Sequence, residues 1–290
     1  MDYLLANLVL ATIFAIFAGS LNIQLGYTGL YNLGQVAFYG IGAYTTALLT
    51  TNGVPIPIGI LAAMVVAAIA GGLIAFPFLR LTGDYFGIAT LAFAEMARLV
   101  FLNERWLTKG PMGIPAIPKP LWLGMPYGSQ LQYLVIALGF AVLAFAFLAV
   151  VQRSPFGRTL KLIREDEHVA GAFGKNVLWF KIRAVMVGAA VAGLAGALWA
   201  HYLTYISPND FTLQTTILIL LVLVLGGRGT FWGPIVGAIA VTVIFEAIRF
   251  IPFPPEMARF VAPIQGIVIG LALIVLMIRR PQGVIAEHRT

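Results

Sequence analysis

The sequence predicts an all-α protein, a polytopic transmembrane helical bundle. Hydrophobic residues make up 60% of the 290 residues and charged residues only 10%, with a mean hydropathy of +0.95. Soluble domains carry roughly 25% charged residues. From Met1 to Leu79 the single charged side chain is Asp2, and a soluble fold of this size could not bury so much apolar surface. The apolar runs are continuous, which favours helices over a barrel with alternating strands.

Nine apolar segments are candidates for helices that cross the membrane, because about 20 largely apolar residues cover the hydrocarbon core. They cover residues 4–21, 33–50, 57–79, 85–102, 131–151, 184–203, 212–225, 233–250 and 260–278. The seventh segment is short, and the fourth and eighth carry charges, so we expect about nine spans within a range of eight to ten. The whole chain, residues 1–290, is predicted to form one transmembrane domain.

The distribution of basic residues predicts the side on which each loop lies. Residues 152–183 hold seven of the 18 Lys and Arg residues, and cytoplasmic loops are enriched in these two residue types. Placing this loop in the cytoplasm also places Arg80 and Arg228 there, with the N-terminus outside and the C-terminus in the cytoplasm. The segment 103–130 contains five prolines. It is expected to be an ordered, extended outer loop rather than a further span.

The segment GYTGLYNLGQVAFYGIG at 26–42 interrupts the apolar pattern before the second span with five glycines and two polar residues. Irregular backbone at membrane depth is tolerated where it lines a cavity or packs within protein, and transporters place broken helices near the midplane. Two interpretations stay open. Either Gly29, Asn32 and Gln35 line the substrate path, or the segment is a tight cytoplasmic turn before an ordinary packing helix.

Two spans carry an acidic and a basic residue three positions apart, Glu95 with Arg98 and Glu246 with Arg249. This spacing places each pair on one helix face. A lone charge in the membrane costs at least about 2.5–3.5 kcal/mol, so each pair is predicted to neutralise itself and to face the bundle interior or a watery cavity. Structural pairing is favoured, and a role of Glu95 and Arg98 in the translocation path or in gating is the alternative.

Small residues recur every four positions in the sixth span, at Gly188, Ala192, Gly196 and Ala200. This spacing lets helix backbones approach closely. It predicts packing within one subunit, and an interface between subunits is the alternative.

The charged loop is predicted to contain one helix, from about Gly157 to Phe173, with Gly174 as the residue that ends it. Four residues would share one helix face: Ile163, Asp166, Ala170 and Phe173. A short helix of this kind is suited to dock into a groove on a soluble partner. An ordinary solvated loop helix is the alternative.

The sequence shows no pattern typical of an enzyme. It has no phosphate-binding G-x-x-x-x-G-K-[ST] loop, no dinucleotide fingerprint and no Ser-His-Asp signal, and its three His residues are scattered. We therefore expect no catalytic residue, no metal and no cofactor bound by this chain. The net charge of +7 is explained by the cytoplasmic loops of a protein in a lipid bilayer, not by nucleic acid.

Four stretches together form a pattern found in one transporter family. They are GYTGLYNLGQVAFYGIGAY at 26–44; LTGDYFGIATLAFAEMARLVFLN at 81–103 followed by LTKGPMGI at 107–114; RSPFGRTLKLIREDEHVAGAFGKNV at 153–177 followed by AGLAGALWA at 192–200; and ISPNDF at 206–211 with VLGGRGTFWGPIVGA at 224–238. In these stretches, which span most of the chain in the same order, the protein resembles the LivM-type permease subunits of bacterial branched-chain amino acid ABC importers. Thr82 is a departure, because the family pattern has Arg there.

The resemblance implies a permease of the ABC importer type in the bacterial plasma (inner) membrane. Its partners would be a second, LivH-like permease subunit, two ABC ATPase subunits that bind the ATP, and an extracytoplasmic substrate-binding protein. Residues 152–183 would be the cytoplasmic coupling loop that contacts the ATPases. The residues assigned to this coupling are Arg158, Arg164, Glu165, Asp166, Glu167, Ala170, Phe173 and Gly174.

Branched-chain or other apolar amino acids, moved into the cytoplasm, are the substrates that the resemblance favours. Urea and short amides are an alternative within the same family. An ion-coupled secondary transporter that works without an ATPase is the alternative from another class, and there Glu95 and Arg98 would form the coupling centre.

Overall fold

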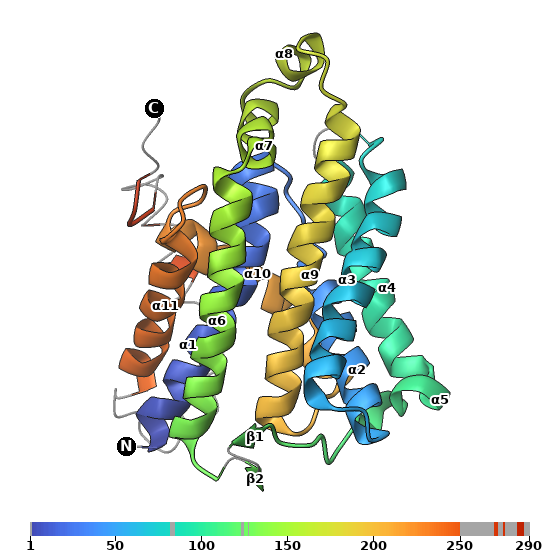
Figure 1. The fold of residues 1–290 in the computed structure, drawn as a ribbon, viewed down its shortest axis with the longest axis vertical. Helices are drawn as coiled ribbons and strands as arrows, with labels where there is room; N and C mark the ends of the chain where they lie inside the picture. Colours follow the sequence, from blue (N-terminus) through green and yellow to red (C-terminus); the bar gives the residue numbers. More distant parts are fainter. Residues whose placement is uncertain are drawn as a thin grey trace.

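A computed structural model of the chain shows a bundle of long helices with a short helical unit projecting from one end (Figure 1). The structure describes residues 2–81, 85–122, 125–126, 128–249, 270–271, 275 and 283–286. The end of the bundle that carries residues 152–183 is called the loop end, and it lies at the top of Figure 1. The opposite end, where the N-terminus lies, is called the distal end.

The first eight predicted segments correspond to helices. These are α1 (Asp2–Leu21), α2 (Gln35–Thr51), α3 (Ile56–Phe78), α4 (Tyr85–Asn103), α6 (Gln130–Arg153), α9 (Val177–Leu203), α10 (Leu213–Gly226) and α11 (Gly233–Arg249). The ninth segment, 260–278, falls almost entirely outside the described residues, as does Thr82. Within the described residues, six helices are long and apolar enough to cross a membrane, so the predicted number of nine spans is not confirmed.

Helix α2 is too short for a span for a geometric reason. At 1.5 Å per residue a helix of 17 residues is about 25 Å long, which is less than the roughly 30 Å of the hydrocarbon core. Helix α2 has 17 residues, whereas α11 runs to Arg249, the last residue described in that part of the chain. The segment 27–34 before α2 is irregular from residue 29 to residue 34, so the helix begins inside the bundle.

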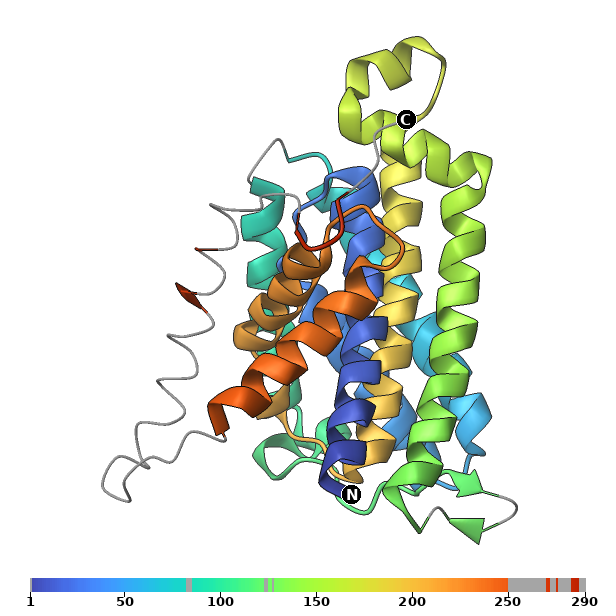
Figure 2. The same ribbon diagram turned by 90° about the vertical axis from the view of Figure 1, so that its left-hand side faces the viewer.

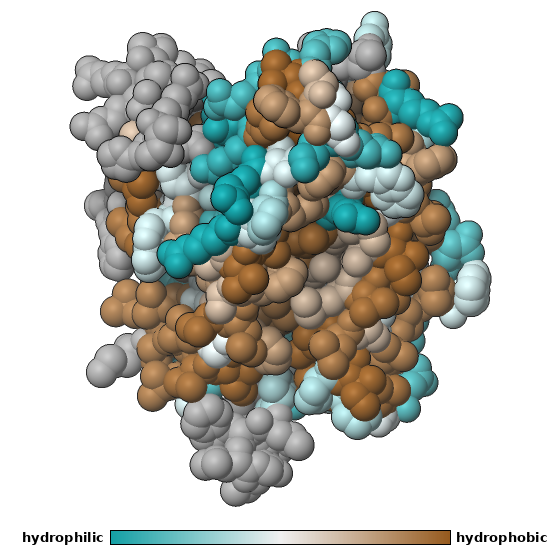
Figure 3. Space-filling view, turned by 45° about the horizontal axis from the view of Figure 1, so that its top comes forward, coloured by the Kyte–Doolittle hydropathy of each residue, from teal (hydrophilic) through white to brown (hydrophobic). Residues whose placement is uncertain are grey.

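Helix α9 lies at the centre of the bundle. It packs against α2 and α3 on one side and against α1 on the other, while α4 lies beside α2 at the edge. On the opposite side, α1 lies between α6 and α11, and α10 packs on α11 (Figure 2). Polar residues cover the loop end, and apolar side chains form the surface below it (Figure 3). This arrangement fits a protein surrounded by lipid between its two ends.

Glycines set the distance between α9 and its neighbours. A Cβ atom added to Gly193 would lie 2.8 Å from the carbonyl oxygen of Ala63 in α3, and one added to Gly196 would lie 2.9 Å from the carbonyl carbon of Tyr39 in α2. A Cβ on Gly188 would lie 2.9 Å from the carbonyl oxygen of Ser20. The small residues of α9 therefore pack within this chain, as the favoured interpretation predicted.

The described residues of the segment 103–130 form an ordered connection at the distal end, as predicted. Its elements are α5 (Arg105–Thr108), the 3-10 turn η2 (Gly110–Met112), and the two-residue strands β1 (Leu121–Trp122) and β2 (Met125–Pro126), which pair antiparallel. A β-bridge between Ile114 and Ile206 ties it to the chain after α9, close to the 3-10 turn η3 (Pro208–Asp210). No further long helix occurs in its described residues.

Candidate functional site

The loop of residues 152–183 forms two short helices, α7 (Pro155–Glu165) and α8 (Glu167–Ala172). The single helix predicted from Gly157 to Phe173 is therefore wrong, because the chain breaks at Asp166. The backbone of Asp166 is extended, with φ −156° and ψ 115°, and its carboxylate accepts hydrogen bonds from the N–H groups of His168 and Val169 at 2.8 and 3.1 Å. A side-chain oxygen in this position starts a new helix.

The cap at Asp166 predicts a pH-dependent α8. The N–H groups of Val169 and His168 lower the pKa of Asp166, because they favour the carboxylate. The folded pKa lies below the unfolded one, so the stabilisation is present above the ordinary Asp pKa and is lost as the pH falls through the folded pKa. We expect Asp166→Ala to speed amide hydrogen exchange across residues 167–173 at neutral pH. Asp166→Asn should preserve protection there, since Asn caps equally well; equal protection in the Ala variant would contradict the cap.

Gly174 ends α8 as predicted. Its φ is +72°, a backbone conformation that favours glycine. The N–H of Gly174 donates to the carbonyl of Gly171 at 2.9 Å, and the N–H of Lys175 donates to that of Ala170 at 3.2 Å. These two bonds form the Schellman pattern, which turns the chain back towards α9.

The predicted docking face of the loop is only partly at the surface. Ala170 is fully buried and Ile163 nearly so, so the small side chain of Ala170 packs inward in this chain, and its role in coupling stays a prediction. Phe173 and Val169 are instead 71% and 41% exposed. We call these two residues the α8 tip, after helix α8, which lies farthest from the bundle in the loop unit (Figure 1).

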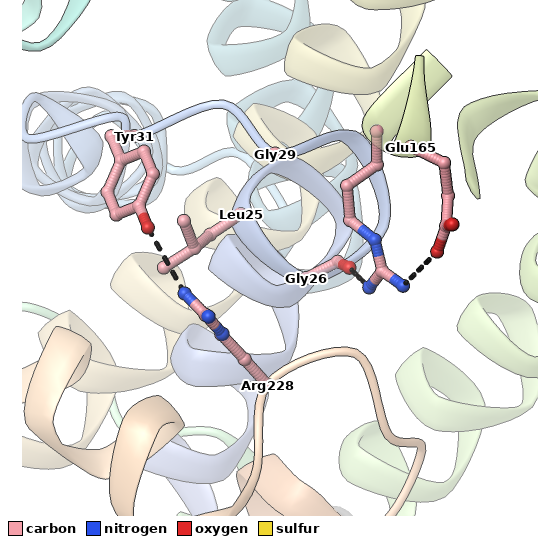
Figure 4. Close-up of a pocket in the computed structure, with 7 residues that line it drawn as sticks. Leu25, Gly26, Gly29, Tyr31, Glu165 and Arg228 are labelled. Atoms are coloured by element: carbon pink, nitrogen blue, oxygen red, sulfur yellow. Dashed lines mark hydrogen bonds and ion pairs between the residues drawn. The ribbon is translucent and has the colours of Figure 1, made fainter. Parts of the chain in front are cut away.

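The base of the loop unit is fixed to the bundle on two sides. The carboxylate of Glu167 forms an ion pair with the ammonium group of Lys181 in α9. In α7, Arg158 is exposed, whereas Arg164 turns inward and its guanidinium donates to the carbonyl oxygen of Gly26 (Figure 4). Arg164 was predicted as part of an ATPase contact, but in this chain it contacts the transmembrane bundle itself.

Arg164 lies in a pocket of about 450 Å³ at the loop end. Its stem is packed on Gly29, where an added Cβ would lie 3.2 Å from the Arg164 Cγ and where φ is +74°. Glu165 lies 3.6 Å from the Arg164 guanidinium, and Arg228 donates to the Tyr31 hydroxyl at 3.1 Å across the pocket (Figure 4). The pocket thus joins the irregular segment 27–34, the end of α7 and the turn before α11.

A buried network of polar side chains lies deeper in the bundle. The amide of Asn32 donates to the side-chain oxygens of Gln24 and Gln35 at 2.7 and 3.2 Å, and Gln35 donates to the Ser20 hydroxyl at 2.8 Å. All four side chains are at most 1% exposed. We call Ser20, Gln24, Asn32 and Gln35 the amide network. It links α1, α2 and the segment between them, and Gln35 also reaches the carbonyl of Gly188 in α9 at 3.4 Å.

The prediction that Asn32 and Gln35 line the substrate path stays a prediction, and in this conformation both are packed within protein. Sequence reasoning missed Ser20 and Gln24, as well as Asn22, which lies in the π-helical turn η1 (Asn22–Gly26) and bonds to the backbone of Thr230 and Gly229 at 2.8 and 2.9 Å. The available signal was the alternation of polar residues at the end of the first apolar run.

An aromatic cluster lies between the amide network and the distal end. Phe17 stacks on Tyr39 with centroids 4.4 Å apart, and Phe211 lies 5.8 and 5.6 Å from Tyr39 and Tyr44. Within the described structure the hydroxyls of Tyr39 and Tyr44 are buried without a hydrogen-bond partner. Buried hydroxyls normally find a partner, so these two groups are exceptions within the described bundle.

The predicted ion pair of α4 is present but does not face the bundle interior. The Arg98 guanidinium donates to both Glu95 oxygens, at 2.5 to 3.1 Å. The Glu95 side chain is 49% exposed and that of Arg98 is 22% exposed, because the opposite side of α4 packs on α2. In α11, Glu246 accepts a hydrogen bond from Tyr3 at 2.6 Å, while the side chain of Arg249 lies outside the described residues.

Comparison with known proteins gives consistent matches along the chain. The model of the family described as branched-chain amino acid transport system / permease component matches residues 3–277. The chain is 34% identical over 304 residues to the high-affinity branched-chain amino acid transport system permease protein LivM of Escherichia coli, covering 97% of this chain and 69% of the relative. It is 26% identical over 315 residues to a probable LivM of Methanocaldococcus jannaschii, covering 92% and 89%.

A more distant relative is the autoinducer 2 import system permease protein LsrC of Salmonella typhi. It is 23% identical over 232 residues, which cover 77% of this chain and 64% of the relative. No solved structure gives a significant match.

Proposed function

Because the chain belongs to the family of branched-chain amino acid transport system permease components, we propose that it is a permease subunit of an ATP-driven ABC importer for branched-chain amino acids. Matches over nearly the whole chain to LivM proteins of two bacteria and an archaeon support this assignment. An ion-coupled transporter without an ATPase is disfavoured, since these relatives are permease components of transport systems.

In this proposal the chain works in the bacterial plasma (inner) membrane with three kinds of partner. A second, LivH-like permease subunit completes the path, two ABC ATPases bind ATP, and an extracytoplasmic binding protein delivers the amino acid. The loop end lies in the cytoplasm and the N-terminus outside, because the Lys and Arg residues gather at the loop end.

The observation that carries the proposal is that the α7–α8 unit has one exposed apolar surface and one contact with the transmembrane bundle. The α8 tip offers apolar side chains to a partner outside the bundle, and Arg164 contacts the segment 27–34 inside it. A push by the ATPases on α8 would therefore move α7, and Arg164 would transmit that movement to Gly26 and Gly29. The amide network is directly connected to this segment through Asn32.

The substrate class follows from the relatives, and the chemistry of the bundle agrees with it. Between the amide network and the distal end, the described interior offers neutral polar groups and aromatic faces. Neutral groups of this kind can make brief hydrogen bonds to a zwitterion without holding it by full charges. Uptake of labelled leucine, isoleucine and valine into vesicles that contain all the subunits tests the assignment. Uptake of urea or acetamide without competition by leucine would contradict it.

Truncating the α8 tip is expected to weaken the association with the ATPases. Phe173→Ala removes a large apolar side chain that a partner would bury, and loss of such an anchor costs about 1–2 kcal/mol of binding, or roughly a ten-fold loss of affinity. Co-purification of the ATPase subunit with the solubilised permease measures this. Trp106→Ala is the matched control, because Trp106 is 82% exposed at the distal end. Unchanged co-purification of Phe173→Ala would show that the ATPases bind elsewhere.

A further inference from the structure

Helix α4 presents a continuous exposed face to its surroundings. The residues of this face, called the α4 face, are Ile88, Ala92, Glu95, Met96 and Leu99. They recur at helical spacing, while Phe86, Phe93 and Phe101 on the other side are buried in the bundle. Helix α4 is the least covered of the six long apolar helices in the described part of the chain.

The α4 face carries charge in the middle of its helix. Glu95 lies about 15 Å along the helix from Tyr85 and about 12 Å from Asn103, at 1.5 Å per residue. A lone charge at such a depth costs at least about 2.5–3.5 kcal/mol in lipid, and the pairing of Glu95 with Arg98 still leaves two charged groups at this depth. Long basic side chains near a helix end can reach the interface instead. Arg98 does not do so, because its guanidinium turns back one helical turn towards the middle to bind Glu95.

The other outward faces of the bundle are different. On α3 the exposed large side chains are aliphatic or aromatic along the whole helix, from Ile58 to Phe76, and on α6 they are so from Leu131 to Val150. These faces suit lipid. Across the described spans, the α4 face is the one that exposes a carboxylate near mid-helix.

We propose that the α4 face is the surface on which the second permease subunit docks, with Glu95 and Arg98 enclosed in the seam between the two subunits. This proposal rests on the proposed function, which requires such a subunit. A protein partner supplies polar groups or enclosed water to the carboxylate, which lipid chains cannot do. Ile88, Met96 and Leu99 provide the apolar area, since they are 62%, 56% and 41% exposed.

The absence of cysteine from the sequence allows a clean test. A single Met96→Cys substitution, labelled with benzophenone maleimide in a complex with cysteine-free partners, places a photoreactive group on the α4 face. Val142→Cys on α6 is the matched control, because Val142 is 67% exposed and also lies near mid-helix. We expect irradiation to join the Met96→Cys chain to the second permease subunit and the Val142→Cys chain to lipid.

Three outcomes decide between the possible neighbours. A cross-link to the second permease subunit at position 96 and not at 142, repeated with Ile88→Cys, supports the proposal. If the second subunit co-purifies but position 96 cross-links to another copy of this chain, or to lipid alone, the docking proposal is overturned. The proposed function then still stands. Absence of the second subunit from the purified complex would overturn the proposed function as well.

Discussion

Replacing Arg164 with Ala is expected to lower ATP-driven uptake about ten-fold or more while the ATPase subunits stay bound. The side chain joins α7 to the carbonyl oxygen of Gly26 and packs on Gly29, so the variant removes the connection between the loop and the segment before α2. A hydrogen bond from a charged donor contributes about 1.5–3 kcal/mol, and 1.4 kcal/mol is a factor of ten. The measurement is leucine uptake together with ATP hydrolysis in reconstituted vesicles.

Controls separate this transmission role from docking or folding. Arg153→Ala removes an exposed arginine at the end of α6 and should leave uptake unchanged. Gly29→Ala should reproduce the defect, because its Cβ would press on the Arg164 stem and its φ of +74° disfavours any side chain. If Arg164→Ala instead releases the ATPases, the residue belongs to the docking surface. Full uptake by that variant would show that the contact is dispensable.

Adding one methyl group to the centre of the bundle is expected to have the second large effect. In Gly196→Ala the new Cβ would lie 2.9 Å from the Tyr39 carbonyl carbon and 3.1 Å from the Ala43 nitrogen. Both are backbone atoms, so α2 and α9 would have to separate. Overpacking of this kind costs about 1–3 kcal/mol, and we expect the upper end of that range. The readouts are a lower yield of monodisperse protein and a lower melting temperature in detergent.

The control for this change is another helical glycine. Gly139→Ala in α6 places its Cβ where no described atom lies within 4 Å. Because Ala is the better helix former by about 1 kcal/mol, that variant should keep or raise the melting temperature. Equal behaviour of the two variants would mean that α2 and α9 are not in close contact.

The helices were predictable because apolarity alone specifies them, and the eight predicted segments within the described residues coincide with helices. The predicted number of nine spans is not confirmed, because the ninth segment lies almost entirely outside the described residues and because an apolar stretch in the sequence can begin before its helix does. Residues 33 and 34 precede α2 and lie in an irregular segment, since Asn32 bonds to Gln24 and Gln35 inside the bundle instead of extending the helix. The hydrophobic periodicity of the sequence does not show whether these residues extend the helix or form an irregular segment.

The helical character of the charged loop was predictable, but the directions of its side chains were not. From the sequence, Asp166 could equally continue a charged helix or cap a new one. In the structure its backbone is extended and it caps α8. Arg164 was assigned to an ATPase contact, but whether a basic residue points towards its own chain or a partner depends on a glycine carbonyl 138 positions away. Glu95 was expected inside because lipid excludes charge, yet that argument cannot distinguish the interior of one subunit from the surface between two.

The amide network has a mechanical consequence. Its hydrogen bonds join α1 and α2 to α9, and the close glycine contacts join α9 to α2 and α3. Neither kind of contact allows one helix to slide along another, since a shift of one residue would leave buried amide groups without hydrogen-bond partners. These four helices should therefore move as a rigid body during alternating access. The displacement that opens one side and closes the other must then occur at the perimeter of that body, where α4, α6 and α7 meet it.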